Sequence, residues 1–94
     1  PAAPANLRGE ATPHLAYLAW DDLSPTELAF ELERSDDGVL FAPLASVGAN
    51  ATTYIDAGRT PGTTHHYRVR ATNAAGVSGW SNVLVLAGSK TRTR

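Results

Sequence analysis

The sequence contains no cysteine. This absence excludes disulfide bonds, thiolate zinc sites, iron–sulfur clusters and cysteine nucleophiles together. No apolar run approaches the ~20 residues that a membrane-spanning helix needs, so membrane insertion is not expected. No stretch has the features of a secretory signal peptide. Because the chain begins at Pro1 rather than methionine, we expect a segment or a processed product of a longer protein, and the compartment stays open.

Helical patterns are also missing, since no window of 11 or more residues places apolar side chains at helical spacing. Alternation with a period of two dominates instead, and it predicts strands. The clearest example is ELAFELERS at 27–35, where alternation puts Leu28, Phe30 and Leu32 on one face. Further strand-like runs follow an extended lead-in at 1–7, and they cover 14–20, 39–47, 52–56, 65–73 and 80–88.

Turn signals separate these runs. Asp37-Gly38 lies between two strand-like stretches and predicts a hairpin, because glycine accepts the positive φ of such a turn. Pro43 interrupts the run at 39–47, which should therefore lie at a sheet edge. About seven short strands without helices between them predict an all-β, seven-stranded antiparallel immunoglobulin-like sandwich. With 94 residues we expect one domain at 1–88 and a flexible tail or linker at 89–94.

The net charge of −1 hides an uneven distribution. All nine acidic residues lie between Glu10 and Asp56, whereas six of the eight Lys and Arg residues lie from Arg59 onward. One interpretation is a basic half that binds nucleic acid or an anionic surface. We favour the other, in which the two halves neutralise each other within the fold, so no nucleic acid partner is predicted.

Several motifs together resemble those of a fibronectin type III domain, from about Pro4 to Leu86. They are PANL at 4–7, Trp20 with Leu18 two residues earlier, and FELERSDDG at 30–38. The stretch YIDAGRTPGTTHHYRVRATNAAGVSGWSNVL at 54–84 resembles the half of the domain that contains strands E, F and G. The resemblance and the alternation imply a structural core that includes Leu18, Trp20, Phe30, Leu32, His65, Tyr67 and Val69.

Two positions depart from the family pattern. Arg59 stands where the family usually has leucine, and His65 stands where it has the tyrosine of the tyrosine corner. In that corner the phenol hydroxyl bonds to backbone a few residues upstream. An imidazole is also a flat ring with a nitrogen donor. We therefore expect His65 to be buried and hydrogen-bonded to backbone near residues 59–62, and His66 to lie on the surface.

No residue pattern predicts catalysis, a cofactor or a metal site. His65 and His66 are adjacent on a predicted strand and point to opposite faces, so they cannot both bind one metal ion. Ser78 lies in GVSGW, which lacks the spacing of a nucleophile elbow. The acidic pairs at 21–22 and 36–37 fall in predicted turns, where aspartate side chains bond nearby backbone, and are not assigned to calcium.

The resemblance implies that strands C (27–35) and F (65–73) are antiparallel neighbours. The outward side chains would then be Glu31 and Glu33 on one strand and Arg68 and Arg70 on the other. Opposite charges across two strands contribute roughly 0.2–1 kcal/mol per pair. Trp80 resembles part of the Trp-Ser repeat of cytokine-receptor domains, where arginines stack on tryptophan rings. These five residues form the candidate interaction surface.

The expected function is that of a non-catalytic module: a spacer or scaffold next to other domains of the same chain, monomeric and, by resemblance, extracellular or on a cell surface. The sequence most resembles accessory modules of bacterial secreted or surface proteins. One alternative is a protein-binding module that uses its C–F–G face or its loops. The other is carbohydrate binding through exposed aromatic residues such as Tyr17, Phe41 or Trp80. Asn50-Ala51-Thr52 also fits the N-glycosylation pattern, and its use stays open.

Overall fold

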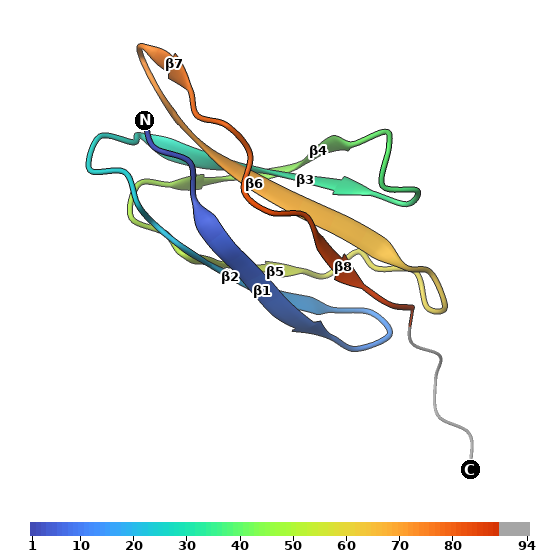
Figure 1. The fold of residues 1–94 in the computed structure, drawn as a ribbon. Coiled ribbons are helices and arrows are strands. Elements are labelled where there is room, and N and C mark those ends of the chain that lie inside the picture. Colours follow the sequence, from blue (N-terminus) through green and yellow to red (C-terminus); the bar gives the residue numbers. More distant parts are fainter. Residues whose placement is uncertain (89–94) are drawn as a thin grey trace.

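A computed structural model describes residues 1–88, which form two antiparallel sheets packed against each other (Figure 1). The three-stranded sheet has the order β1 (Ala5–Ala11), β2 (Ala16–Asp21), β5 (Thr53–Asp56). The five-stranded sheet contains β4 (Ala42–Gly48), β3 (Ala29–Ser35) and β6 (His65–Asn73), and both β7 (Gly76–Val77) and β8 (Leu84–Leu86) pair with β6. The predicted all-β sandwich is therefore confirmed. No helix in this part of the chain is long and apolar enough to cross a membrane.

An unpredicted short strand, β7, lies between the predicted strands 65–73 and 80–88, which gives eight strands in the described residues instead of seven. Of the predicted strand 80–88, only Leu84–Leu86 forms a strand. Between β7 and β8, two serines continue the pairing with β6 in place of a regular ladder. Ser78 N donates to Ala71 O at 2.8 Å, and Ser78 Oγ accepts from Ala71 N at 2.8 Å. Ser81 makes the equivalent pair with Val69, at 2.8 and 3.1 Å. Each hydroxyl thus takes the role that a strand carbonyl would have.

The core lies between the sheets and contains apolar side chains from both. Trp20 and Phe30, one from each sheet, meet edge to face with ring centroids 5.7 Å apart. The alternation of β2, β3 and β6 explains this arrangement, because every second side chain of each strand is directed inward. The buried apolar residues are Leu7, Ala16, Leu18, Trp20, Phe30, Leu32, Tyr67, Val69 and Ala71.

The expectation for the start of strand 27–35 is wrong. Leu28 is exposed and Glu27 is buried, the reverse of the predicted alternation. The strand begins only at Ala29, so Leu28 lies outside the pleat, where its N–H donates to Thr72 O at 2.7 Å. Glu27 instead accepts a hydrogen bond from Asn50 N at 3.1 Å. Hydrogen bonds to β6 and to the β4–β5 loop, rather than side-chain alternation, decide the orientation of these two residues.

The edge strands β4 and β1 both have a register shift in their pairing. β4 lies at the edge of its sheet, as Pro43 predicted. On β1, the register shifts between Ala5 and Arg8, and Asn6 has a φ of 55°. The side chain of Asn82 pairs with the bulged segment: Oδ1 accepts from Leu7 N at 2.8 Å, and Nδ2 donates to Leu7 O at 3.0 Å. A side-chain amide therefore connects β1 to the segment that leads into β8.

Truncation of a buried leucine and of an exposed leucine should change the free energy of unfolding by different amounts. Leu32→Ala should lower the free energy of unfolding by about 2–5 kcal/mol, because Leu32 is 1% exposed and truncation leaves a cavity. Leu40→Ala is the matched control, since Leu40 is 78% exposed, and it should change stability by less than about 0.5 kcal/mol. Urea unfolding measures both values. Equal losses in the two variants would contradict this description of the core.

Candidate functional site

The outer face of the five-stranded sheet carries two ion pairs in direct register. Glu31 lies opposite Arg70, and Glu33 lies opposite Arg68. Arg68 reaches Glu33 Oε1 through Nη2 at 2.7 Å and Nε at 3.1 Å, while Arg70 Nε reaches Glu31 Oε1 at 2.7 Å. All four side chains are partly exposed, so each pair contributes a fraction of a kcal/mol up to about 1 kcal/mol. Here the acidic and basic halves of the sequence meet.

Aromatic rings extend these pairs into a layered stack. The guanidinium carbon of Arg68 lies 4.1 Å from the ring centroids of both Phe41 and Trp80, and that of Arg70 lies 4.4 Å from Trp80. Arg68 and Arg70 are two positions apart on one strand, about 7 Å, so the indole lies between them. We call Phe41, Arg68, Trp80 and Arg70 the arginine–aromatic stack. The role of Phe41 in it was not predicted.

Each charged or aromatic group of the arginine–aromatic stack is already in contact with a partner. Both arginines have a carboxylate partner and an aromatic partner, and the faces of Trp80 are covered by guanidinium groups. A sugar ring could stack on Trp80 only after displacing an arginine. The arrangement is therefore suited to stiffening the sheet surface rather than to holding a ligand.

A second polar cluster lies where β5 ends. Asp56 is 2% exposed and its carboxylate accepts three hydrogen bonds, from Arg34 Nη1 at 2.8 Å, Tyr67 Oη at 2.8 Å and Gly58 N at 3.0 Å. Burial alone would raise the pKa of Asp56, but the bonds from Gly58, Tyr67 and Arg34 outweigh it and lower the pKa. Burial and the neighbouring carboxylate raise the pKa of Tyr67. Asp56 was not singled out from the sequence, where it is only the last residue of a short strand.

The expected hydrogen bond from His65 to upstream backbone is absent, although the ring is buried. Its Nδ1 has no hydrogen-bond partner, and Nε2 lies 3.6 Å from Oδ1 of the exposed Asp36. Arg59, itself 4% exposed, makes the backbone contacts instead. Its Nη2 donates to Thr63 O and Ala87 O, both at 3.1 Å, and more weakly to Leu86 O at 3.5 Å. The longer arginine reaches carbonyls that the shorter imidazole does not.

Neither histidine is placed to bind a metal ion. Burial and the charges of Arg34 and Arg59 lower the pKa of His65, so its ring is neutral at neutral pH. His66 is half-buried, with Nδ1 3.3 Å from Ser35 O. Within residues 1–88, no group of three or more His, Cys, Asp or Glu side chains could hold a metal ion. Ser78 Oγ is occupied by Ala71 N and Gly79 O.

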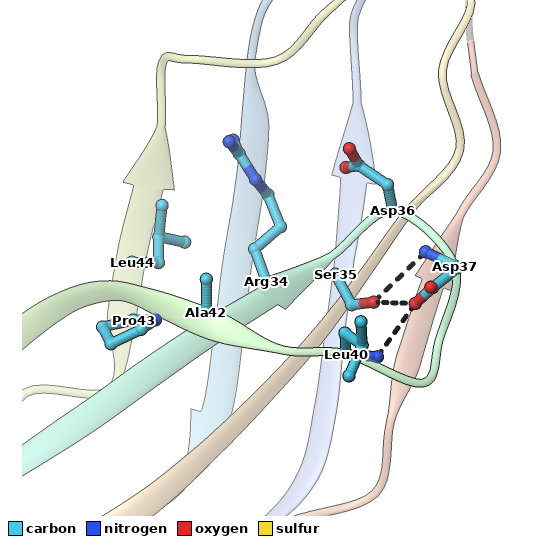
Figure 2. A pocket seen from close by; sticks show the side chains of 8 residues that line it. All are labelled: Arg34, Ser35, Asp36, Asp37, Leu40, Ala42, Pro43 and Leu44. Atoms are coloured by element: carbon cyan, nitrogen blue, oxygen red, sulfur yellow. Dashed lines mark hydrogen bonds between the residues drawn. The ribbon is translucent and has the colours of Figure 1, made fainter.

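Two open hollows lie along β3 and β4. The first, of about 330 Å³, surrounds the β3–β4 hairpin (Figure 2). Figure 2 shows Ser35 and Asp37 joined by hydrogen bonds at the turn, while Arg34 points away from it. Arg34 Nη1 donates to Asp56 Oδ2 at 2.8 Å. Hydrogen bonds from the backbone of Leu40 and Val39 lower the pKa of Asp37 to about 2. The second hollow, of about 410 Å³, lies beside Glu31, Glu33 and Arg70. The polar groups at the hairpin turn hold its backbone in place.

These observations define an immunoglobulin-like β-sandwich whose polar clusters connect strands. No family model and no curated protein matches the sequence. Among solved structures, an Fn3-like protein from Clostridium thermocellum is 25% identical with a TM-score of 0.79, over 99% of this chain and 98% of that one. The fn3 domain of human collagen alpha-1(XX) chain is 19% identical with a TM-score of 0.83, over 99% and 90%. The chain therefore has the fold of fibronectin type III domains, as the sequence motifs implied.

A third similar structure is much longer than this chain. It is a β-1,2-glucanase from Parabacteroides distasonis, 22% identical with a TM-score of 0.83. The match covers 97% of this chain but only 13% of the glucanase. The fold thus also occurs as a small part of a large enzyme chain.

The pKa shifts of His65 and of the Asp56 cluster predict that the free energy of unfolding falls in two steps on acidification. The native pKa of His65 lies below the unfolded value of about 6.5, so the unfolded state binds the proton first and stability declines below about pH 6.5. The native pKa values of Asp56 and Asp37 lie below about 3.9, which gives a second decline below about pH 4. Urea unfolding from pH 8 to 3 measures both steps. His65→Gln should remove the first step only, and a flat wild-type profile between pH 7 and 5 would contradict the assignment.

The arginine–aromatic stack predicts energetic coupling between two of its members. A double-mutant cycle of Arg68→Ala and Trp80→Ala should give a coupling free energy of roughly 0.5–1 kcal/mol, since the two groups are in direct contact. The control cycle combines Trp80→Ala with Arg8→Ala, because Arg8 pairs with Asp21 in the other sheet. Its coupling should be near zero. Equal coupling in both cycles would show that the contact contributes nothing specific.

Proposed function

We propose that this chain is a non-catalytic spacer or scaffold module in a larger, multidomain protein that acts outside the cell. The observation that carries the proposal is the way the two ends of the described chain leave the sandwich. Figure 1 shows the N-terminus and the end of β8 at opposite ends of the molecule. Modules that connect neighbours in series need this arrangement.

The C-terminal exit is also held firmly. Gly88 N donates to Thr64 Oγ1 at 3.2 Å, and Arg59 holds the carbonyl of Ala87. A Cβ atom at Gly88 would collide with the backbone of Gly62, so only glycine permits this close approach. A fixed exit favours a defined orientation of whatever segment follows residue 88.

The multidomain context is supported by the glucanase, in which a domain of this fold occupies a small part of a long chain. Catalysis is not indicated for this chain, and neither the arginine–aromatic stack nor the Asp56 cluster offers a free nucleophile or base. The extracellular setting remains part of the proposal.

The two alternatives would use different surfaces. A protein-binding module would use the outer face of the five-stranded sheet, where the Glu31 side chain is 41% exposed and that of Arg70 28%. Carbohydrate binding would instead use the other sheet, because the faces of Trp80 are covered. There Tyr17 is 46% exposed opposite Ile55, beside a hollow of about 300 Å³.

A binding survey with the purified chain tests the proposal. We expect a monomer in light scattering, with no retention on insoluble polysaccharides and no signal on a glycan array. Retention that is lost in Tyr17→Ala but kept in the exposed control Val85→Ala would establish carbohydrate binding and overturn the spacer assignment. A protein captured at micromolar affinity or tighter, and lost in Arg70→Ala, would establish the protein-binding alternative.

A further inference from the structure

The loop between β2 and β3 contains a buried carboxylate with an unused oxygen. Glu27 is 7% exposed, and its Oε2 accepts from Asn50 N at 3.1 Å. Its Oε1 is covered but has no hydrogen-bond partner. Buried carboxylate oxygens are normally hydrogen-bonded, so an unpartnered one needs an explanation such as an unseen ion. The alternation of residues 27–35 predicts that Glu27 faces outward, so its burial does not follow from the sequence pattern.

A second carboxylate lies next to Glu27. The Asp22 and Glu27 carboxylates are within hydrogen-bonding reach of each other. Ser24 N donates to Asp22 Oδ1 at 2.9 Å. Within residues 1–88, no Lys, Arg or His nitrogen lies within 4.0 Å of either carboxylate. Two adjacent carboxylates without a basic partner repel each other unless a cation or a proton lies between them.

The remaining groups of the loop are also oxygen donors. Ser24 is 6% exposed, and its hydroxyl lies near the Glu27 carboxylate and 3.2 Å from Thr26 N. A set of two carboxylates and a hydroxyl, without nitrogen or sulfur ligands, matches the preference of Ca²⁺ for oxygen. We propose that the β2–β3 loop binds a divalent cation of the Ca²⁺ class through Asp22 and Glu27, with the Ser24 hydroxyl and water as further ligands.

Neighbouring loops hold this site in shape. Leu28 N donates to Thr72 O at 2.7 Å, and Asn73 Nδ2 donates to Thr26 O at 3.2 Å, which fixes the loop against the end of β6. The bond from Asn50 N fixes it against the β4–β5 turn at the same end of the sandwich (Figure 1). A bound cation would therefore connect the loops at the end where the N-terminus lies. With only two carboxylates, we expect a dissociation constant in the range of weak sites, roughly 10⁻⁴–10⁻³ M.

Thermal unfolding of the metal-stripped chain, with CaCl₂ or with NaCl of equal ionic strength, tests the site. At a Ca²⁺ concentration ten times the dissociation constant, the midpoint should rise by roughly 5–10 °C over the NaCl sample. Asp22→Asn and Glu27→Gln should each abolish the rise. Asp21→Asn is the matched control, because Asp21 pairs with Arg8 outside the loop, and it should keep the rise. Tb³⁺ emission excited through tryptophan should show the same dependence on the two ligands.

Two outcomes would overturn the proposal. One is that Ca²⁺ does not raise the unfolding midpoint of the wild type, or that it raises the midpoint of both ligand variants by the same amount as that of the wild type. The other is a shared proton instead of a cation: Ca²⁺ would have no effect, and Asp22→Asn would remove a gain in stability that develops as the pH falls toward about 4. If Glu27→Gln fails to fold, Asp22→Asn still decides, since Asp22 is only half-buried.

Discussion

The carboxylate of Asp56 is the contact on which the end of the sandwich depends. It extends from β5 in one sheet and receives hydrogen bonds from Arg34 on β3 and Tyr67 on β6 in the other. A chain without cysteine has no disulfide bond between its sheets, and a domain of this size buries a modest apolar core. Removing one donor would leave a buried charge undercompensated, which typically costs about 3–5 kcal/mol. The three elements are therefore fixed to one another by a single ionised group.

The two departures from the family pattern, His65 and Arg59, compensate for each other at this end of the sandwich. With imidazole in place of phenol at His65, no hydroxyl reaches the upstream backbone. Arg59 carries five N–H donors and satisfies the carbonyls of Thr63 and Ala87, which a leucine would leave without this partner. The guanidinium charge in turn favours a neutral His65. At this turn Arg59 thus replaces the usual leucine, and the smaller imidazole ring of His65 replaces the usual phenol ring of tyrosine.

The sequence was sufficient for the strands and their inward faces wherever alternation was strict. That Glu31 and Glu33 face Arg68 and Arg70 also followed from charge once the family arrangement was assumed, whereas the register that pairs Glu31 with Arg70 and Glu33 with Arg68 came from the structure. Prediction failed where side chains bond to backbone far along the chain, as Arg59, Glu27 and Asn82 do, because such contacts leave no period in the sequence. It also failed at 76–88. Apolar residues on both faces give no alternation near β8, and the hydroxyls of Ser78 and Ser81 replace strand carbonyls.

The distribution of satisfied and unsatisfied groups separates the structural parts of the molecule from those left for interaction. On the outer face of the five-stranded sheet, Arg68 and Arg70 are paired with glutamates on β3 and stacked on aromatic rings. This face therefore offers few polar groups that are free to bind a ligand. Unpartnered buried polar atoms lie at both ends. At one end Arg59 and Gly88 fix the exit of the chain, while Arg59 Nε, Arg59 Nη1 and His65 Nδ1 have no partner. At the other end the Glu27 carboxylate retains an unpartnered oxygen. If the chain acts in a linear array of domains, as proposed, these ends of the sandwich are where a neighbouring domain would meet it.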